Sequence, residues 1–125
     1  MTAPRWLPLA VAVAAFLAVT QYWKKPHAEP VICERDVAAA AADVVMLGAS
    51  WCRYCRAARS YLVAAGINYC EFDIEQSSRG AELYAASGVG VIPVVYIGED
   101  LIVGFDRDEL TEVLLAHDLP RLDHR

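Results

Sequence analysis

Two cysteines separated by two residues offer the clearest chemistry in this sequence. Cys52 and Cys55 lie in the stretch SWCRYC, directly after a short apolar run and at the start of a segment with helical spacing. The N-terminus of a helix stabilises a thiolate through its unpaired N–H groups and partial positive charge. We therefore expect Cys52 to be a nucleophile. Cys55, one turn later, is expected to attack a mixed disulfide formed on Cys52.

The chain contains four cysteines, so a zinc site and a purely structural disulfide are alternatives. Metal sites usually use two closely spaced pairs, whereas Cys33 and Cys70 are isolated in the sequence. A disulfide between Cys52 and Cys55 would close too small a loop to stabilise the fold much. We expect no metal. We interpret Cys70 as a buried, inert thiol on the inner face of a strand, and leave Cys33 either free or paired with Cys70.

Three arginines, Arg53, Arg56 and Arg59, surround the cysteine pair. From Asp43 onward the chain has 13 acidic and seven basic residues, so this cluster stands out on an acidic domain. Positive charge in the first turn of a helix opposes the helix dipole, and such violations are expected at functional sites. One hypothesis is that the arginines lower the pKa of the first cysteine and attract an anionic thiol. The alternative is that they are surface arginines paired with nearby acids.

The elements that must position these residues follow from Asp43 onward. Apolar runs and alternation indicate strands, helical spacing and caps indicate helices, and a GED turn indicates a hairpin. The order predicts an α/β fold with a four-stranded mixed sheet and helices on both faces. The expected strands are 44–49, 67–74, 90–97 and 101–103, and the expected helices are 52–66, 77–87 (capped by Ser77 or Ser78 and ended by Gly88) and 107–117 (capped by Asp106 with Glu109).

Pro93 is the second informative residue. A proline inside the strand-like stretch GVIPVVYI would remove a hydrogen bond of the sheet. If the Ile92–Pro93 bond is cis, the chain turns at the start of the strand and the backbone of Ile92 is free to pair with an extended, peptide-like ligand. The alternative is a trans proline on an edge strand.

The N-terminal region has a different composition. The 18 residues 6–23 carry no charge and have aromatic residues at both ends, which predicts a membrane anchor. A cleaved signal peptide and a buried helix are the alternatives. The predicted organisation is an anchor over 1–25, a linker over 26–42 whose alanine-rich part is either a short helix or a spacer, a domain over 43–118 and a tail over 119–125. The formal charge of −5 argues against nucleic acid as a partner.

Residues 43–117 resemble a glutaredoxin. The motifs that carry the resemblance are WCRYC for the family's C-P-Y-C, VIP at 91–93 for its T-V-P, and VGFD at 103–106 for its G-G-x-D. The resemblance implies a thioredoxin-like fold, a cis Pro93 and glutathione as co-substrate, with no metal. It also implies a glutathione site made by Arg53, Tyr54, Arg56, Ile92, Pro93, Gly104, Phe105 and Asp106. In that site the Ile92 backbone pairs with the cysteinyl part, and Asp106 with the adjacent helix start holds the γ-glutamyl end.

The sequence departs from the family pattern at two positions. Arg53 replaces the proline between the cysteines, and Ala49 replaces the usual lysine three residues before the first cysteine. Arg53 or Arg56 is expected to substitute for that lysine. The stretch GFDRDEL is similar to glutaredoxin-like proteins that draw electrons from thioredoxin reductase.

The expected function is a membrane-anchored, glutathione-dependent thiol–disulfide oxidoreductase that acts on disulfides or glutathionylated proteins. The alternatives are a dithiol oxidoreductase fed by a protein reductant, and a non-enzymatic iron–sulfur or scaffold module. The two flanks of residues 6–23 carry nearly equal positive charge, so the sequence does not orient the anchor. Analogy with tethered thioredoxin-fold domains favours the extracytoplasmic face of a bacterial inner membrane.

Overall fold

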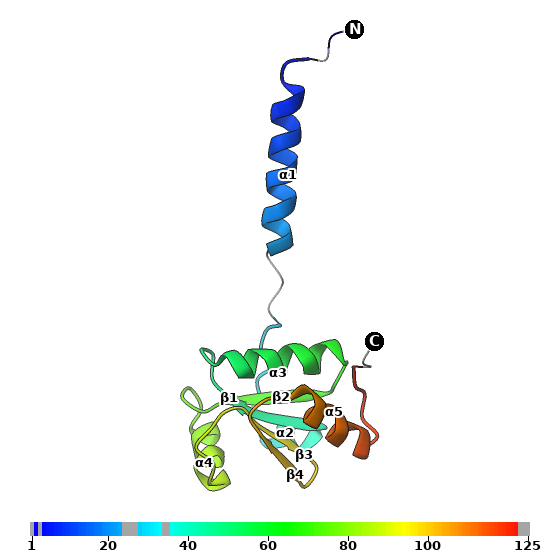
Figure 1. The fold of residues 1–125 in the computed structure, drawn as a ribbon. Helices are drawn as coiled ribbons and strands as arrows, with labels where there is room; N and C mark the ends of the chain where they lie inside the picture. Colours follow the sequence, from blue (N-terminus) through cyan, green and yellow to red (C-terminus); the bar gives the residue numbers. More distant parts are fainter. Residues whose placement is uncertain (1, 3, 24–27, 34–35, 123–125) are drawn as a thin grey trace.

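The computed structural model describes residues 2, 4–23, 28–33 and 36–122. The described part of the chain forms an α/β fold around one four-stranded sheet, with strand order β2-β1-β3-β4 (Figure 1). The strands are β1 (Val44–Gly48), β2 (Tyr69–Asp73), β3 (Val94–Ile97) and β4 (Asp100–Val103). The helices are α1 (Leu7–Trp23), α2 (Asp36–Ala41), α3 (Arg53–Ala64), α4 (Ser78–Ser87) and α5 (Arg107–Ala116).

The sheet is mixed, as the sequence predicts. β1 and β2 are parallel and are joined by the crossover helix α3, whereas β1 and β3, and β3 and β4, are antiparallel. In register, Met46 of β1 lies between Glu71 of β2 and Val95 of β3. The central β1 is covered on both faces, which explains its nearly continuous apolar sequence.

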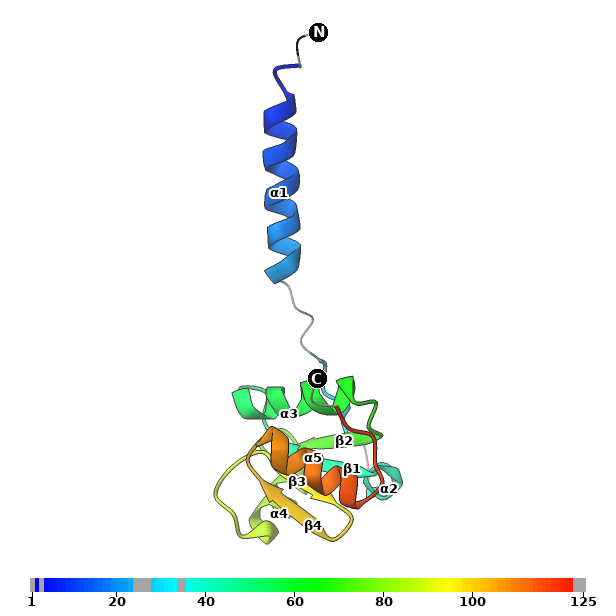
Figure 2. The same cartoon turned by 45° about the vertical axis from the view of Figure 1, so that its right-hand side comes forward.

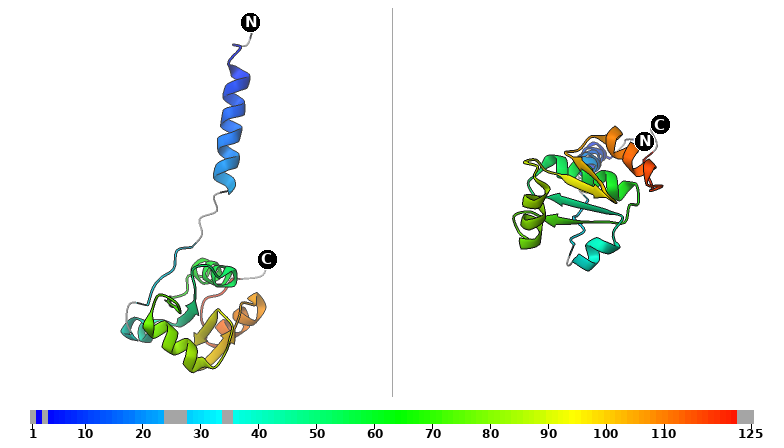
Figure 3. Two further views of the ribbon diagram at one scale, coloured as in Figure 1. Left: turned by 90° about the vertical axis from the view of Figure 1, so that its left-hand side faces the viewer. Right: turned by 90° about the horizontal axis from the view of Figure 1, so that it is seen from below.

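Each face of the sheet builds its own core. On one face, Val44 and Met46 of β1 pack with α3 and α5 (Figure 2). On the other face, Leu47 of β1 packs with residues of α2 and α4; Figure 3 (right) shows α2 and α5 on opposite sides of the sheet. Helices on both faces are therefore confirmed. The alanine-rich stretch of the predicted linker is the short helix α2.

Local signals set the ends of the later helices. The Ser77 side chain caps α4 by accepting from the Gly80 backbone N–H, and Gly88 ends the helix with a φ of 70°. Asp106 caps α5 by accepting from the backbone N–H groups of Asp108 and Glu109. These caps agree with the sequence-based expectations. The predicted strand 90–97 is shorter, because the chain turns at Pro93 before β3 begins at Val94.

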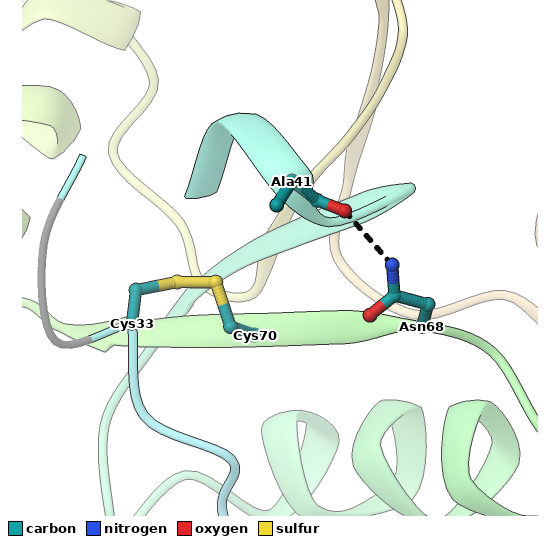
Figure 4. Close-up of a disulfide and its surroundings, with 4 residues drawn as sticks. All are labelled: Cys33, Ala41, Asn68 and Cys70. Carbon is teal, nitrogen blue, oxygen red and sulfur yellow. Dashed lines mark hydrogen bonds between the residues drawn. A yellow bond between two sulfur atoms is a disulfide. The ribbon is translucent and has the colours of Figure 1, made fainter. Parts of the chain in front are cut away.

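A disulfide joins the chain before the domain to the edge of the sheet. Cys33 and Cys70 are bonded, with both residues 4% exposed (Figure 4). Beside it, Val31 and Cys33 hydrogen-bond to the two backbone groups of Glu71, so this short segment covers the open edge of β2. The interpretation of Cys70 as a free thiol is wrong: its side chain does point inward, but it meets Cys33 there.

The expected membrane anchor is contradicted. α1 has 17 residues, and at 1.5 Å per residue it is about 26 Å long, shorter than the roughly 30 Å hydrocarbon core of a bilayer. Across the described ranges, no helix combines the length and the apolar character needed to cross a membrane. The predicted single-pass localisation, with the domain on the extracytoplasmic face, is therefore not supported. Figure 3 (left) draws α1 apart from the sheet.

Candidate redox site

The two cysteines occupy different positions at the start of α3. Cys52 is the N-cap residue, with extended backbone (φ −75°, ψ 114°), and its sulfur accepts a hydrogen bond of 3.2 Å from the Cys55 backbone N–H. The Cys52 thiol lies 3.9 Å from the Ile92 carbonyl oxygen. Both cysteines are free thiols. The Cys52 sulfur therefore receives an N–H group and lies at the positive end of the helix dipole.

Cys55 is sealed inside the protein. It is 0% exposed, whereas Cys52 keeps 4% of its surface and borders a groove. A Cβ placed on Gly48 would lie 3.1 Å from the Cys55 sulfur, so the missing side chain of this glycine leaves room for the thiol. Burial raises the pKa of Cys55 to about 12, helped by its contact with Cys52. The thiol of Cys55 is therefore protonated at neutral pH.

A groove of about 690 Å³ opens beside Cys52. Four of the residues that the sequence predicts for ligand binding line it, namely Arg53, Tyr54, Arg56 and Ile92. The Arg53 guanidinium lies 5.3 Å from the centre of the Tyr54 ring. The structure adds residues that the sequence reasoning did not assign to the site, namely Trp51, Ile74, Tyr84, Gly90 and Val91.

Trp51 forms one exposed wall of this groove. Its indole N–H donates to a Glu75 carboxylate oxygen at 2.8 Å, and 63% of the residue remains exposed. Tyr54, at 54% exposed, stands nearby in the same lining. The groove thus combines aromatic surface with two cations, and both kinds of surface suit an extended thiol-containing ligand.

The three arginines separate into two groups. Arg53 and Arg56 are exposed on the groove, and neither forms a salt bridge with any described residue. Arg59 is 4% exposed and forms a bidentate ion pair with Glu71, which raises the pKa of Arg59. Arg59 is therefore paired with an acid, as in the alternative, but it is buried rather than on the surface.

The other residues predicted for glutathione binding lie outside the groove lining; they are Pro93, Gly104, Phe105 and Asp106. The Ile92–Pro93 bond is cis, as expected, and the Pro93 carbonyl accepts from the Gly104 backbone N–H at 2.7 Å. This contact brings the stretch 104–106 beside the proline. Phe105, however, packs towards Tyr61, with ring centres 6.4 Å apart.

Asp106 is engaged by its own helix. One oxygen of its carboxylate accepts from the Asp108 and Glu109 backbone N–H groups at 2.9 and 3.0 Å. The N-terminus of α5 is therefore already capped by this side chain, and Asp106 is not part of the groove that Cys52 borders. No group of three metal-ligating side chains occurs in the portion of the chain covered by the structure.

Comparison with models of known protein families finds one match in this chain. The glutaredoxin family model matches residues 44–102, which contain both free cysteines and Pro93. No curated protein sequence matches the chain.

Solved structures show the same architecture at low sequence identity. A glutaredoxin from Archaeoglobus fulgidus has a TM-score of 0.55 and 23% identity, covering 65% of this chain and 95% of that one. NrdH-redoxin from Escherichia coli, a glutaredoxin-like protein, has a TM-score of 0.52 and 21% identity, covering 56% and 92%. These likenesses show a thioredoxin-like fold, and the match to the glutaredoxin family model covers slightly less than half of the chain.

Proposed function

We propose that this protein is a glutathione-dependent thiol–disulfide oxidoreductase in which Cys52 is the nucleophile and Cys55 the resolving cysteine. The observation that carries the proposal is the position of the Cys52 sulfur. It lies at the N-cap of α3, accepts an N–H group at 3.2 Å and borders a groove that also contains Arg53 and Arg56. The substrates would be disulfides or glutathionylated proteins.

The reaction begins with attack of the Cys52 thiolate on one sulfur of the substrate disulfide. A bond forms between Cys52 and that sulfur, the substrate disulfide breaks, and the other sulfur leaves as a thiolate that takes a proton. With a glutathionylated protein, the protein thiol is released and glutathione remains on Cys52.

Two routes then regenerate the Cys52 thiol. In the one-cysteine route, a second glutathione thiolate attacks the adduct and leaves as glutathione disulfide. In the two-cysteine route, Cys55 loses its proton and attacks Cys52, which releases glutathione and forms a Cys52–Cys55 disulfide that a donor must reduce. Because Cys55 is fully buried and burial raises the pKa of its thiol, we expect the one-cysteine route to be the faster one at neutral pH.

Arg53 and Arg56 would bind the carboxylates of glutathione. They are the cations of the groove lining. Ala49, which replaces the lysine usual in glutaredoxins, is 2% exposed and contributes no charge. A guanidinium binds a carboxylate through two parallel hydrogen bonds, so either arginine is suited to the role.

A protein reductant is the second candidate donor. Asp106, which the resemblance assigns to the γ-glutamyl end of glutathione, lies outside the groove and caps α5. The structural neighbour NrdH-redoxin is described as a glutaredoxin-like protein with a thioredoxin-like activity profile. A dithiol enzyme fed by a reductase would need both cysteines and no glutathione site.

A donor assay on the full chain separates these candidates. The substrate is a glutathione mixed disulfide, and the donor is either glutathione or a thioredoxin reductase system. We expect turnover with glutathione that survives in Cys55→Ser and is lost in Cys52→Ser. Turnover with the reductase alone, lost in both variants, would instead establish the protein-fed dithiol enzyme. No turnover with either donor would leave a binding module and reject the proposal.

A further inference from the structure

The proposed mechanism leaves one buried pair of charges unused. The Arg59 Nε donates to Glu71 Oε2 at 2.9 Å, and its Nη2 donates to Oε1 at 2.7 Å. Both side chains are 5% exposed. Desolvating two charges costs several kcal/mol per ion in real proteins, and apolar replacements of such pairs are often as stable or more so. Stability alone therefore does not explain why an ion pair occupies this position.

The pair lies next to the resolving cysteine. Arg59 follows Cys55 by four residues on α3, so the two side chains share the buried face of the helix. Glu71 points from β2 to the same face of the sheet as Met46, its register partner, and Gly48, against which the Cys55 sulfur packs. The thiol, the guanidinium and the carboxylate thus form one buried cluster between α3 and the sheet.

The other polar groups around Cys55 can be named from each element. Cys52 lies across the first turn of α3, and the Ala49 backbone lowers the pKa of the Cys55 thiol. On β2, Tyr69 lies on the same face as Glu71, the face covered by α3; burial raises the pKa of Tyr69, so it stays neutral near neutral pH. The charge of Glu71 raises the pKa of Cys55, and Arg59 is the one cation that faces this cluster from the described elements.

We propose that Glu71 is a positioning residue that restrains the resolving step, because its buried carboxylate opposes the negative charge that develops on Cys55, whereas its ion-pair partner Arg59 acts in the opposite direction. The inference rests on the proposed role of Cys55. In this step Cys55 gives its proton to solvent and its sulfur attacks Cys52. The Cys52–Cys55 bond forms, the bond from Cys52 to the bound thiol breaks, and that thiol leaves with the electron pair and takes a proton.

Removing the charge of Glu71 or that of Arg59 should change the rate of the resolving step in opposite directions. Glu71→Gln keeps the size of the side chain but leaves the Arg59 cation without a counter-charge, which favours the Cys55 thiolate. A neighbouring charge of this kind changes a pKa by about one unit or more. One unit gives about ten times more thiolate, and the accompanying loss of nucleophilicity removes about a factor of three, so the step should be about threefold faster at neutral pH. Arg59→Gln leaves the carboxylate and should make the step slower.

The test uses stopped-flow mixing of the full chain with an aromatic disulfide that releases the coloured thionitrobenzoate. The first coloured phase reports attack by Cys52, and the second reports release of the bound thionitrobenzoate by Cys55. The first phase therefore tests the proposed function, and the second phase tests this inference. Cys55→Ser should lose only the second phase, and loss of the first phase in the wild type would reject the role of Cys52.

We expect the second phase to be about threefold faster in Glu71→Gln and slower in Arg59→Gln. The double variant Arg59→Met/Glu71→Leu, which removes both charges, should return to the wild-type rate and also serves if a single variant does not fold. Glu112→Gln is the matched control, since it removes one exposed carboxylate on α5. An unchanged or slower second phase in Glu71→Gln, or a double variant as fast as Glu71→Gln, would overturn the proposal.

Discussion

The backbone N–H of Cys55 points at the sulfur of Cys52 across 3.2 Å. This contact makes the two cysteines unequal although they share one helical turn. Cys52 receives the hydrogen bond at the helix end and borders the groove, whereas Cys55 is fully buried against Gly48. The asymmetry is the structural basis for assigning attack to the first cysteine and resolution to the second.

The raised pKa of Cys55 predicts a pH-dependent stability. The folded state holds the thiol proton up to about pH 12, whereas the unfolded chain releases it near its ordinary value of 9.0. The stabilising contribution is therefore complete below about pH 9 and is lost as the pH rises towards 12. In a Cys52→Ala background, where Cys55 is the remaining free thiol, the free energy of unfolding should fall more steeply above pH 9 than in Cys52→Ala/Cys55→Ala.

Urea unfolding at neutral pH and at several alkaline values measures this difference. The double variant is the control for tyrosines and other groups that titrate in the same range. Parallel curves for the two proteins would show that the Cys55 thiol does not titrate differently in the folded and unfolded states.

The Cys33–Cys70 disulfide predicts a large contribution to stability. Its cysteines are 37 residues apart, and the chain-entropy relation gives about 4 kcal/mol for a closed loop of that length. Cys33→Ala/Cys70→Ala should lower the free energy of unfolding by about that amount, measured by urea titration without reductant. A reductant should lower the midpoint of the wild type but leave the double variant unchanged, and equal midpoints for the two proteins without reductant would contradict the prediction.

Gly80 lies where α4 meets the sheet, at a position that leaves no room for a side chain. A Cβ at this position would lie 2.5 Å from the Asp73 carbonyl oxygen, and backbone cannot easily move away. Gly80→Ala should cost about 1 to 3 kcal/mol, although alanine is the better helix former. Gly90→Ala is the matched control, because nothing lies within 4 Å of its Cβ. The comparison is made by thermal unfolding, and an equal or higher midpoint for Gly80→Ala would refute the clash.

Arg53 and Arg56 are expected to contribute to the binding of glutathione in the proposed reaction. Arg53→Gln and Arg56→Gln should each raise the KM for a glutathione mixed disulfide about threefold, the scale of one exposed charge pair. The effect should shrink at high ionic strength, because exposed charges are screened. Arg121→Gln, which removes an exposed charge near the C-terminus, should leave KM unchanged. If all three variants behave alike, only the net charge of the protein matters and the groove arginines have no specific role.

The order of strands and helices was accessible from the sequence because its signals are local. Gly88 and the capping residues Ser77 and Asp106 act within a few positions of the helix ends that they determine. The CxxC motif likewise lies between a strand and a helix, and Pro93 is cis as expected.

Contacts between residues far apart in the sequence could not be predicted in the same way. Cys33 and Cys70 are isolated in the sequence, which left Cys33 either free or paired with Cys70, and the folded chain shows that the two are paired. Arg59 falls on the helix face shared by Cys55 and Leu62. Glu71, however, alternates with Cys70 and Phe72, which the sequence places on the inner face of the strand, so its burial could not be predicted. The folded chain covers both faces of β2, and this covering buries the ion pair.

The anchor prediction failed on length rather than on composition. Residues 6–23 are uncharged throughout, but the helix begins only at Leu7 and is 17 residues long.

The groove could not be predicted in full either, because Ile74 and Tyr84 reach it from segments that follow β2.

The most direct test of the role proposed for Cys52 is to trap the first covalent intermediate. The full-length Cys55→Ser variant is incubated with glutathione disulfide, and the adduct is located by mass spectrometry of proteolytic fragments. We expect one glutathione per chain, on Cys52, and no adduct in Cys52→Ser. An adduct on Cys55 in Cys52→Ser, or no adduct on Cys52 in Cys55→Ser, would contradict the assignment of Cys52 as the nucleophile.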